Sequence, residues 1–326
     1  MTQTVLVTGG AGFIGAYVTR RLLKEGMRVV VYDMQPRGNV LDLLMPDRES
    51  TRNAPILESG EITDGFRLLS LCRQHNVEAI VHLASPLTMD VVSNPATGIR
   101  DICLGTHTVF ATAREARLKR VVWASSVAIF GTAADYPPGP LAEDAFHRPP
   151  NLYGAAKSLC ETMARQMAET DGLDTIGLRL SVVYGAGRRR GYMTYPSALM
   201  RDAATTDAVV VRFGDQKLHW QYVEEVAGMA LVALTAPQLG RGHVYNAFGD
   251  CRSWRDAAAI LRSLKPELNI AIRDEIDEAL AGTVEDYAAE RFVRDFASTR
   301  QWPLEAGIKD TLDTYRTMAA RTPAQL

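Results

Sequence analysis

A glycine-rich turn between an apolar run and a helical pattern opens the chain, and this arrangement constrains the fold more than any other feature. The apolar run is residues 5–7, and the turn follows it as Thr8-Gly9-Gly10-Ala11-Gly12-Phe13-Ile14-Gly15. Ile14, Val18 and Leu22 then recur every four residues, and Gly26 marks the end of the helix that they predict. A second apolar run, residues 29–32, follows directly. A strand, a helix and a second strand in this order are the unit from which doubly wound α/β sheets are built.

The same alternation of short apolar runs and helical patterns continues to about residue 180. Further strands are expected at residues 79–82, 121–123 and 176–180, with a weaker one at 56–57. Continuous apolar runs of this kind suit strands that are buried on both faces of a parallel sheet. We therefore expect an α/β fold with a doubly wound, parallel Rossmann sheet.

The glycine turn also predicts a ligand. Glycines let the backbone approach a pyrophosphate group, which then lies at the positive end of the helix dipole. Asp33 ends the second strand, 18 residues after Gly15. A carboxylate at this point would accept hydrogen bonds from both ribose hydroxyls and would repel the 2′-phosphate of NADP. A turn that serves packing alone does not explain this order, so we expect NAD as the cofactor, while the nearby Arg37 leaves NADP open.

Beyond residue 186 the pattern becomes less regular. Helices are expected at residues 196–204, 227–236, 253–264 and 304–319, and strands at 209–213 and 243–246. The proline-rich residues 136–150 predict a surface loop. We expect an NAD-binding Rossmann domain in residues 1–186, to which residues 218–247 return, and a smaller, mixed α/β domain, mainly substrate-binding, in residues 187–326.

Tyr153 and Lys157 lie four residues apart, on one face of a predicted helix. The positive charge of the lysine favours a phenolate, which can take a proton from a substrate hydroxyl. This spacing alone is common on helix surfaces, but Ser125 and Ser126 end a predicted strand that precedes it. Ser126 would face the same crevice as the glycine turn, although a helix cap or turn is the plainer interpretation of the serine pair. The predicted catalytic residues are Ser126, Tyr153 and Lys157.

With these motifs in place, the chain resembles the extended short-chain dehydrogenase/reductases, the superfamily of NAD-dependent sugar epimerases and dehydratases. Matching segments run through nearly the whole chain, at residues 8–15, 33, 60–64, 82–85, 125–131, 143–144, 153–157, 161, 179–185, 222–227, 245–246 and 302–303. The resemblance implies the same three catalytic residues, and it implies that Ile62, Leu83, Ala84 and Val182 line the cofactor cleft. The full set of predicted cofactor-binding residues is Gly9, Gly12, Phe13, Ile14, Gly15, Asp33, Glu61, Ile62, Leu83, Ala84, Ser85, Tyr153, Lys157 and Val182.

Departures from the family pattern narrow the chemistry. Residues 127–131, which follow the predicted catalytic serine, hold no acid, and this disfavours dehydration. Val182 stands where sugar-nucleotide members usually carry an asparagine, and residues 218–220 lack the arginine that often precedes Tyr222. Ile102 replaces an asparagine that helps to relay the proton in many members. We therefore expect a substrate smaller than a nucleotide sugar.

Three consecutive arginines, residues 188–190, lie beside the expected pocket. A guanidinium fork would hold a sugar acid or hydroxy acid, although a solvated surface loop is the slightly better explanation for at least two of the three arginines. His82 is interpreted as a strand-end histidine with satisfied hydrogen bonds, and His219 as a surface residue, rather than as acids or ligands. The predicted substrate-binding residues are Ser85, Ser126, Tyr153 and Arg189.

The favoured function is an NAD-dependent oxidoreductase that moves a hydride between a secondary alcohol of a small polar substrate, such as a sugar or sugar acid, and the nicotinamide. An epimerase of a sugar or nucleotide sugar, in which the keto intermediate takes the hydride back, would use the same three residues. A catalytically silent NAD-binding sensor is a third possibility, which the joint presence of Ser126, Tyr153 and Lys157 disfavours.

Bulk features restrict the partners. The net charge of −2 argues against nucleic-acid binding, and the N-terminus predicts neither a signal peptide nor a membrane span. The four cysteines lack the paired spacing of a metal site, so we expect no metal and reduced thiols in the cytoplasm. The family resemblance implies a homodimer through a four-helix bundle. Its predicted stripes, which core packing would explain equally well, are residues 156, 160, 163 and 167, and residues 99, 102, 106, 109 and 113.

Overall fold

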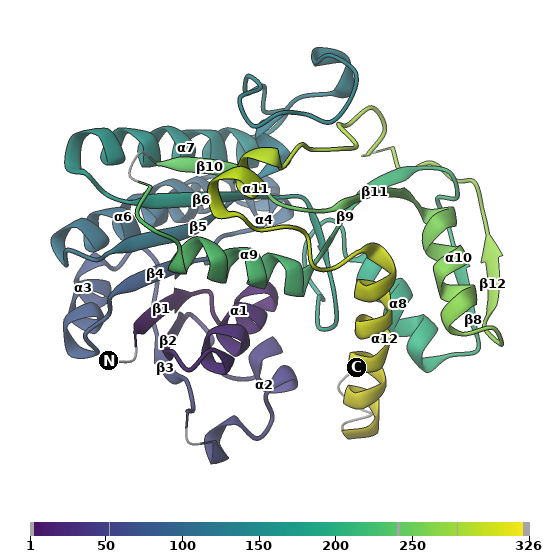
Figure 1. Cartoon of the computed structure of the whole chain (residues 1–326), viewed down its shortest axis with the longest axis horizontal. Coiled ribbons are helices and arrows are strands. Elements are labelled where there is room, and N and C mark those ends of the chain that lie inside the picture. The colour runs from purple at the N-terminus through teal and green to yellow at the C-terminus, as the bar shows by residue number, and fades with distance from the viewer. Residues whose placement is uncertain (1–2, 52, 240–241, 279, 322–326) are drawn as a thin grey trace.

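The computed structural model describes residues 3–51, 53–239, 242–278 and 280–321. Its larger part is a seven-stranded sheet in which every neighbouring pair of strands is parallel, in the order β10-β6-β5-β4-β1-β2-β3 (Figure 1). The strands are β1 (Thr4–Thr8), β2 (Arg28–Asp33), β3 (Ile56–Ser59), β4 (Ala79–His82), β5 (Arg120–Ser126), β6 (Thr175–Leu180) and β10 (His243–Asn246). The predicted doubly wound parallel sheet is confirmed, including its weakest strand, β3.

Helices cover both faces of this sheet, which explains why its strands are apolar along their whole length. Val5 and Val7 of β1 pack in the same hydrophobic cluster as the helices of one face, whereas Leu6 packs with those of the other. The first face carries α1 (Phe13–Lys24) and α9 (Val223–Thr235), and the second carries α3 (Gly65–Gln74), α6 (Gly105–Glu115) and α7 (Leu152–Asp171).

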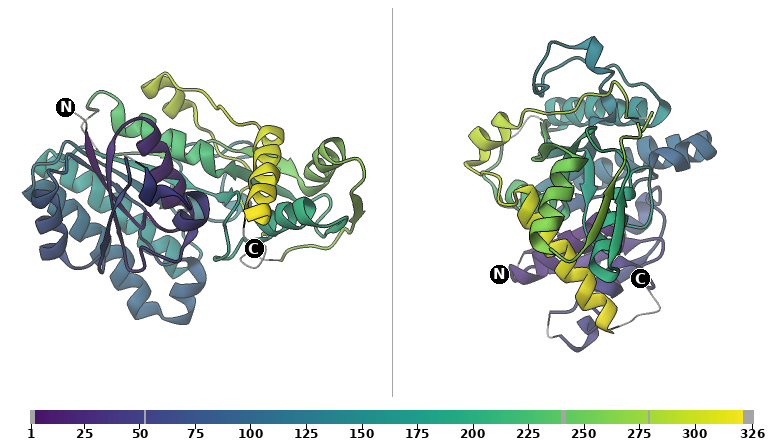
Figure 2. Two further views of the ribbon diagram at one scale, coloured as in Figure 1. Left: turned by 90° about the horizontal axis from the view of Figure 1, so that it is seen from below. Right: turned by 90° about the vertical axis from the view of Figure 1, so that its right-hand side faces the viewer.

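A smaller part with mixed sheets lies beside the large sheet, as expected, and Figure 2 shows it from two further directions. In one small sheet β9 pairs with β11 in antiparallel and with β7 in parallel orientation, and β8 and β12 form a parallel pair. This part contains β7 (Val182–Tyr184), α8 (Tyr195–Thr205), β8 (Ala208–Val211), β9 (Lys217–Tyr222), β11 (Asp250–Ser253), α10 (Trp254–Leu264), β12 (Asn269–Ile272) and α12 (Leu304–Arg321).

Short elements connect these units. They are α2 (Val40–Leu44), α4 (Thr88–Ser93), α5 (Pro95–Ile99), a π-helical segment η2 (Arg100–Leu104), α11 (Glu290–Phe296) and the 3₁₀ turns η1 (Arg48–Ser50), η3 (Val127–Ile129) and η4 (Ala133–Asp135). Residues 136–150 contain neither helix nor strand, as their prolines predict. Within the described ranges, no helix is both long and apolar enough to cross a bilayer.

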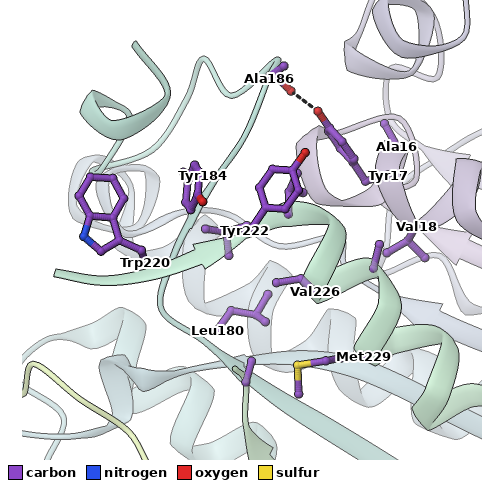
Figure 3. Close-up of a cluster of buried hydrophobic side chains, with 14 of the residues drawn as sticks. Ala16, Tyr17, Val18, Leu180, Tyr184, Ala186, Trp220, Tyr222, Val226 and Met229 are labelled. Carbon is purple, nitrogen blue, oxygen red and sulfur yellow. Dashed lines mark hydrogen bonds between the residues drawn. The ribbon is translucent and has the colours of Figure 1, made fainter. Parts of the chain in front are cut away.

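An aromatic cluster joins the two parts (Figure 3). Tyr17 of α1 donates a hydrogen bond of 2.9 Å to the backbone oxygen of Ala186, which follows β7. The Tyr184 ring lies 5.6 Å from that of Trp220 and 5.4 Å from that of Tyr222, measured between centroids. The loop after β7 is thereby held against the helix that follows the glycine turn.

The structure corrects several expectations from the sequence. The helix predicted at 227–236 begins at Val223, where Tyr222 ends β9. The segment that carries the stripe of residues 99 to 113 is divided among α5, η2 and α6. The stripes expected at a dimer contact are largely buried within one chain. Their members Ile102, Val109, Ala156 and Cys160 are at most 5% exposed, because α6 and α7 pack them against their own sheet. Core packing explains these four residues, whereas Ile99 of the second stripe is exposed.

Candidate active site

The glycine turn lies where the winding of the sheet reverses. β1 pairs with β2 on one side and with β4 on the other, so the loops after β1 and β4 diverge above a crevice. Gly9 has a φ of +68°, and a Cβ placed on it would lie 2.7 Å from the backbone nitrogen of Ala84. A residue with a side chain would therefore be strained in conformation and would collide with the loop after β4.

The N-terminus of α1 is built to receive an anion. The N-cap residue is Gly12, so no side chain caps this end of the helix, and the first turn contains no acidic residue. A Cβ on Gly15 would lie only 2.0 Å from the backbone oxygen of Gly9, so the turn can wrap tightly only with glycine here. The amides of the first turn remain available for a pyrophosphate, and the helix dipole favours its charge.

Asp33 ends β2 as expected and is oriented by the backbone. Its carboxylate accepts hydrogen bonds from the backbone nitrogens of Ala11, at 3.2 Å, and Gln35, at 3.0 Å. Each carboxylate oxygen retains a further lone pair for a ribose hydroxyl. Arg37 instead forms an ion pair of 2.6 Å with Glu49, and both side chains are 67% exposed.

The predicted catalytic residues come from β5 and α7. Ser126 is the last residue of β5, and its Oγ accepts a hydrogen bond of 3.1 Å from the Ala128 nitrogen, so it also caps the turn that follows. Lys157 is 4% exposed and its Nζ donates to the Ala124 oxygen at 2.9 Å. The same Nζ lies 5.8 Å from the centroid of the Tyr153 ring. The ammonium is therefore fixed beside the phenol.

A buried ion pair between Glu161 and Arg179 connects α7 to the sheet next to these residues. Glu161 of α7 accepts hydrogen bonds from Arg179 Nε, at 2.9 Å, and Nη2, at 2.8 Å, and from Ser125 Oγ at 2.6 Å. Burial raises the pKa of Glu161, but the hydrogen bonds from Arg179, His147 and Ser125 and the charge of Arg179 outweigh it and lower the pKa to about 2. Ser125 thus connects β5 to α7, a role that its position beside Ser126 did not predict.

His82 has satisfied hydrogen bonds, as predicted. Its Nδ1 lies 2.8 Å from Thr8 Oγ1 and its Nε2 lies 3.2 Å from Thr106 Oγ1. Burial, with a smaller contribution from the charge of Lys157, lowers its pKa to about 3. His82 is therefore a neutral structural residue under the turn at physiological pH.

The prediction that His219 is a surface residue is wrong. His219 is 4% exposed, and burial lowers its pKa to about 4. It lies on the central strand of the small sheet, with the Tyr287 ring 5.1 Å away between centroids, and Gly249 packs directly on it. These neighbours are far away in sequence, so the local pattern could not reveal the burial.

A cavity of about 1960 Å³ joins these elements. It exceeds the roughly 300–1,000 Å³ of a pocket for a drug-sized ligand, and it has room for a dinucleotide together with a small substrate. Every predicted cofactor-binding, catalytic and substrate-binding residue lines it: Gly9, Gly12, Phe13, Ile14, Gly15, Asp33, Glu61, Ile62, Leu83, Ala84, Ser85, Ser126, Tyr153, Lys157, Val182 and Arg189. His219 and Leu218 also line the wall.

The three arginines differ in their surroundings. Arg188 is half-buried, whereas Arg189 and Arg190 are exposed, and Arg190 lies 3.4 Å from Asp90. All three border the cavity. The sequence indicated the cluster but could not tell which guanidinium is turned inward, because the side-chain directions follow from the backbone of the loop.

Comparison with known protein families classifies the chain. The model of the NAD dependent epimerase/dehydratase family matches residues 5–247, which is well over half of the sequence. The chain belongs to this family. The resemblance to extended short-chain dehydrogenase/reductases is thereby confirmed.

Individual relatives are more distant. The chain is 33% identical over 183 residues to a UDP-glucose 4-epimerase of Azospirillum brasilense, a match that covers 56% of this chain and 49% of that protein. The chain thus spans about half the length of these curated relatives. Among solved structures, it superposes on a UDP-glucose 4-epimerase of Thermotoga maritima with a TM-score of 0.80 and 23% identity, covering 97% and 99% of the two chains. It also superposes on an L-threonine dehydrogenase of Clostridium difficile with a TM-score of 0.83 and 20% identity, covering 98% of each chain. These likenesses confirm the fold.

The cofactor of the family is NAD, and the residues of this chain fit it. The uncapped first turn of α1 and the close approach of Gly9 and Gly15 leave space and donors for a pyrophosphate. The Asp33 carboxylate at the end of β2 suits a ribose without a 2′-phosphate.

Proposed function

We propose that this protein is an NAD-dependent oxidoreductase that acts on a secondary alcohol of a small polar substrate. The observation that carries the proposal is the position of Lys157, whose ammonium is buried, anchored to Ala124 and 5.8 Å from the ring centroid of Tyr153. A lysine on a helix surface would point into solvent. A buried ammonium beside a phenol that lines a cavity instead suits a proton acceptor.

In the proposed mechanism Ser126 holds the substrate hydroxyl beside Tyr153. Tyr153, as a phenolate favoured by the Lys157 ammonium, takes the hydroxyl proton. The proton is returned from the tyrosine in the reverse direction. A bound NAD would supply the acceptor for the hydride of the substrate carbon. Lys157, whose Nζ donates to the Ala124 oxygen, would hold the nicotinamide ribose beside the phenol.

Tyr153→Phe tests the mechanism. The variant lacks the acidic hydroxyl, so turnover should be abolished while NAD still binds, as measured by calorimetric titration. Tyr245→Phe is the matched control, because Tyr245 hydrogen-bonds Asp295 and does not line the cavity. Unchanged turnover in Tyr153→Phe removes Tyr153 from the mechanism.

An epimerase is the second candidate, and the names of the curated relatives favour it. Val182 and Leu218 line the cavity as apolar residues, which counts against a nucleotide diphosphate as a ligand there. Incubation with candidate substrates and excess NAD separates the two reactions. Net absorbance of reduced nicotinamide identifies a dehydrogenase, and product without it identifies an epimerase.

Two parts of the chain have different roles in the proposed enzyme. Residues 1–186, with residues 218–247, would bind NAD, and residues 187–326 would mainly shape the substrate site. Ser85, Ser126, Tyr153 and Arg189 are the proposed substrate-binding residues, and all four border the cavity.

We also propose a cytoplasmic homodimer. Since most residues of the predicted stripes are buried, the contact would use exposed residues of α4, α5, η2 and α7, which pack on one another. The exposed large apolar residues of these four elements are Met89, Val92, Ile99, Leu104, Leu152 and Leu159. A monomer in analytical ultracentrifugation would contradict this arrangement.

A further inference from the structure

Of the three arginines in the loop that follows β7, Arg188 is the least exposed. Arg188 is half-buried in this loop and lines the cavity together with Tyr153 and Ser126. A Cβ placed on Gly191 would lie 3.5 Å from Arg188 Nη2 and 3.2 Å from Leu87 Cδ1. The guanidinium therefore lies over Gly191, on the side of the cavity formed by the residues that follow Ser85.

The backbone of this loop is fixed from three helices. Three hydrogen bonds join it to side chains of α1, α8 and α12: Tyr17 Oη to the Ala186 oxygen at 2.9 Å, the Gly185 nitrogen to Ser197 Oγ at 3.2 Å, and the Gly187 nitrogen to Tyr315 Oη at 3.3 Å. The backbone angle φ is +152° at Gly185, +93° at Gly187 and +102° at Gly191, values that residues other than glycine rarely adopt. Arg188 is thus presented by a rigid support, which reduces the entropy lost when it binds a ligand.

The charge of Arg188 is not compensated by an acid of this chain. Its Nη1 donates to the Val183 oxygen, and within the described part of the chain no carboxylate lies at ion-pair distance from it. Burial lowers the pKa of Arg188 to about 10, an effect that the neighbouring Tyr153 partly opposes. Removing a guanidinium from water without a counter-ion costs free energy. A bound anion offsets this cost because it accepts paired hydrogen bonds from the guanidinium.

We propose that Arg188 binds a carboxylate of the substrate, next to the alcohol on which Ser126 and Tyr153 act, so that the enzyme selects hydroxy acids. This inference rests on the proposed oxidoreductase function for the position of the alcohol. It places the carboxylate at Arg188 in place of Arg189, the arginine among the proposed substrate-binding residues, because Arg189 is exposed. A guanidinium has five N–H donors, so Arg188 can keep its hydrogen bond to the Val183 oxygen while another edge donates to both carboxylate oxygens.

The test compares acids with neutral analogues of the same shape. The probes are a panel of 2-hydroxy and 3-hydroxy carboxylic acids, sugar acids included, each beside its primary amide, with the full chain and NAD. The wild-type protein should favour the acid by on the order of 100-fold in kcat/KM, the usual range when one partner of a buried charge pair is lost. Arg188→Met should remove this preference, and Arg188→Lys should keep part of it. Arg190→Met, which changes an exposed residue paired with Asp90, should keep all of it.

Several results would overturn the inference. They are equal rates for acid and amide in the wild-type protein, a preference that survives in Arg188→Met with NAD binding intact, or a preference that Arg189→Met removes instead. The inference is also overturned if no acid reacts and no acid raises the melting temperature of the NAD-bound protein.

A binding measurement separates this inference from the proposed function. Acids should still raise the melting temperature of NAD-bound Tyr153→Phe, which cannot turn them over, and should not do so for Arg188→Met. If acids stabilise the wild-type protein in this Arg188-dependent way and none is oxidised, the carboxylate site stands and the oxidoreductase function fails. If amides are oxidised as fast as acids, the function stands and the carboxylate site fails.

Discussion

The Glu161–Arg179 pair offers the sharpest test of how the catalytic elements are held together. The side chains of Glu161 and Arg179 are 4% and 5% exposed, and two hydrogen bonds of 2.8 and 2.9 Å join them. Glu161→Gln keeps the shape and removes the charge, which leaves the Arg179 guanidinium buried without a counter-ion. Loss of one partner of such a pair costs about 3–5 kcal/mol.

This cost converts into a melting temperature. Unfolding entropy is about 2.1 cal/mol/K per residue, or about 0.7 kcal/mol/K for 326 residues. Division of the expected cost by this entropy gives a decrease of roughly 4–7 °C for Glu161→Gln. Differential scanning calorimetry of the purified protein measures it directly.

Two comparisons make the result interpretable. Glu49→Gln breaks an ion pair whose side chains are both 67% exposed, and it should leave the melting temperature unchanged. The double variant Glu161→Gln with Arg179→Met should be less destabilised than the sum of the single variants, because it removes the uncompensated charge. An unaltered melting temperature in Glu161→Gln would refute the view that this pair holds β5, β6 and α7 together.

The pH dependence follows from the same carboxylate. The folded state lowers the pKa of Glu161 from 4.5 to about 2, so its stabilisation is complete above pH 4.5 and is lost as the pH falls toward 2. The difference in stability between the wild-type protein and Glu161→Gln should therefore shrink over this interval. A difference that is constant with pH would contradict the assignment.

Two further predictions concern the cofactor turn and the buried histidines. Gly15→Ala places a Cβ 2.0 Å from the Gly9 oxygen, so the turn must open and NAD affinity should fall by on the order of tenfold or more in calorimetric titration; unchanged affinity would mean that the turn adapts freely. Burial lowers the pKa values of His82 and His219 from 6.5 to about 3 and 4. Below pH 6.5 these two histidines are therefore protonated in the unfolded chain but still neutral in the folded chain. Stability in urea should be highest above pH 6.5 and should decrease toward about pH 5, above the ordinary carboxyl range, whereas a flat profile in this interval would be inconsistent with neutral, buried rings.

The sequence predicted the sheet and the position of the glycine turn because both depend on local patterns. The turn from Gly9 to Gly15 and the apolar runs of β1, β2 and β4 carry their structural meaning within a few residues. β11 and β12 were not predicted, since four-residue strands with charged or alternating side chains have no strong local pattern. Their pairing depends on β9 and β8, which are far away in the chain.

The substrate end of the site was harder to predict for the same reason. The burial of His219 depends on Gly249 and Tyr287, and the direction of Arg188 depends on a loop held by other helices. The stripe on α7 shows another limit of local patterns. Its spacing is real, but spacing alone does not tell whether an apolar face meets its own sheet or a second subunit.

The two ends of the cavity therefore depend on different parts of the fold. The NAD end is formed by β1, α1, β2 and β4, whose geometry follows from the sheet itself. The proposed substrate end combines Ser85, Ser126 and Tyr153 of the larger part with the loop after β7. Hydrogen bonds with the side chains of Tyr17, Ser197 and Tyr315 hold this loop, which presents Arg188. Proteins named as a UDP-glucose 4-epimerase and an L-threonine dehydrogenase superpose on this chain almost equally well, with TM-scores of 0.80 and 0.83. Overall shape therefore does not identify the substrate, and we propose that side chains lining the cavity, Arg188 foremost, select it.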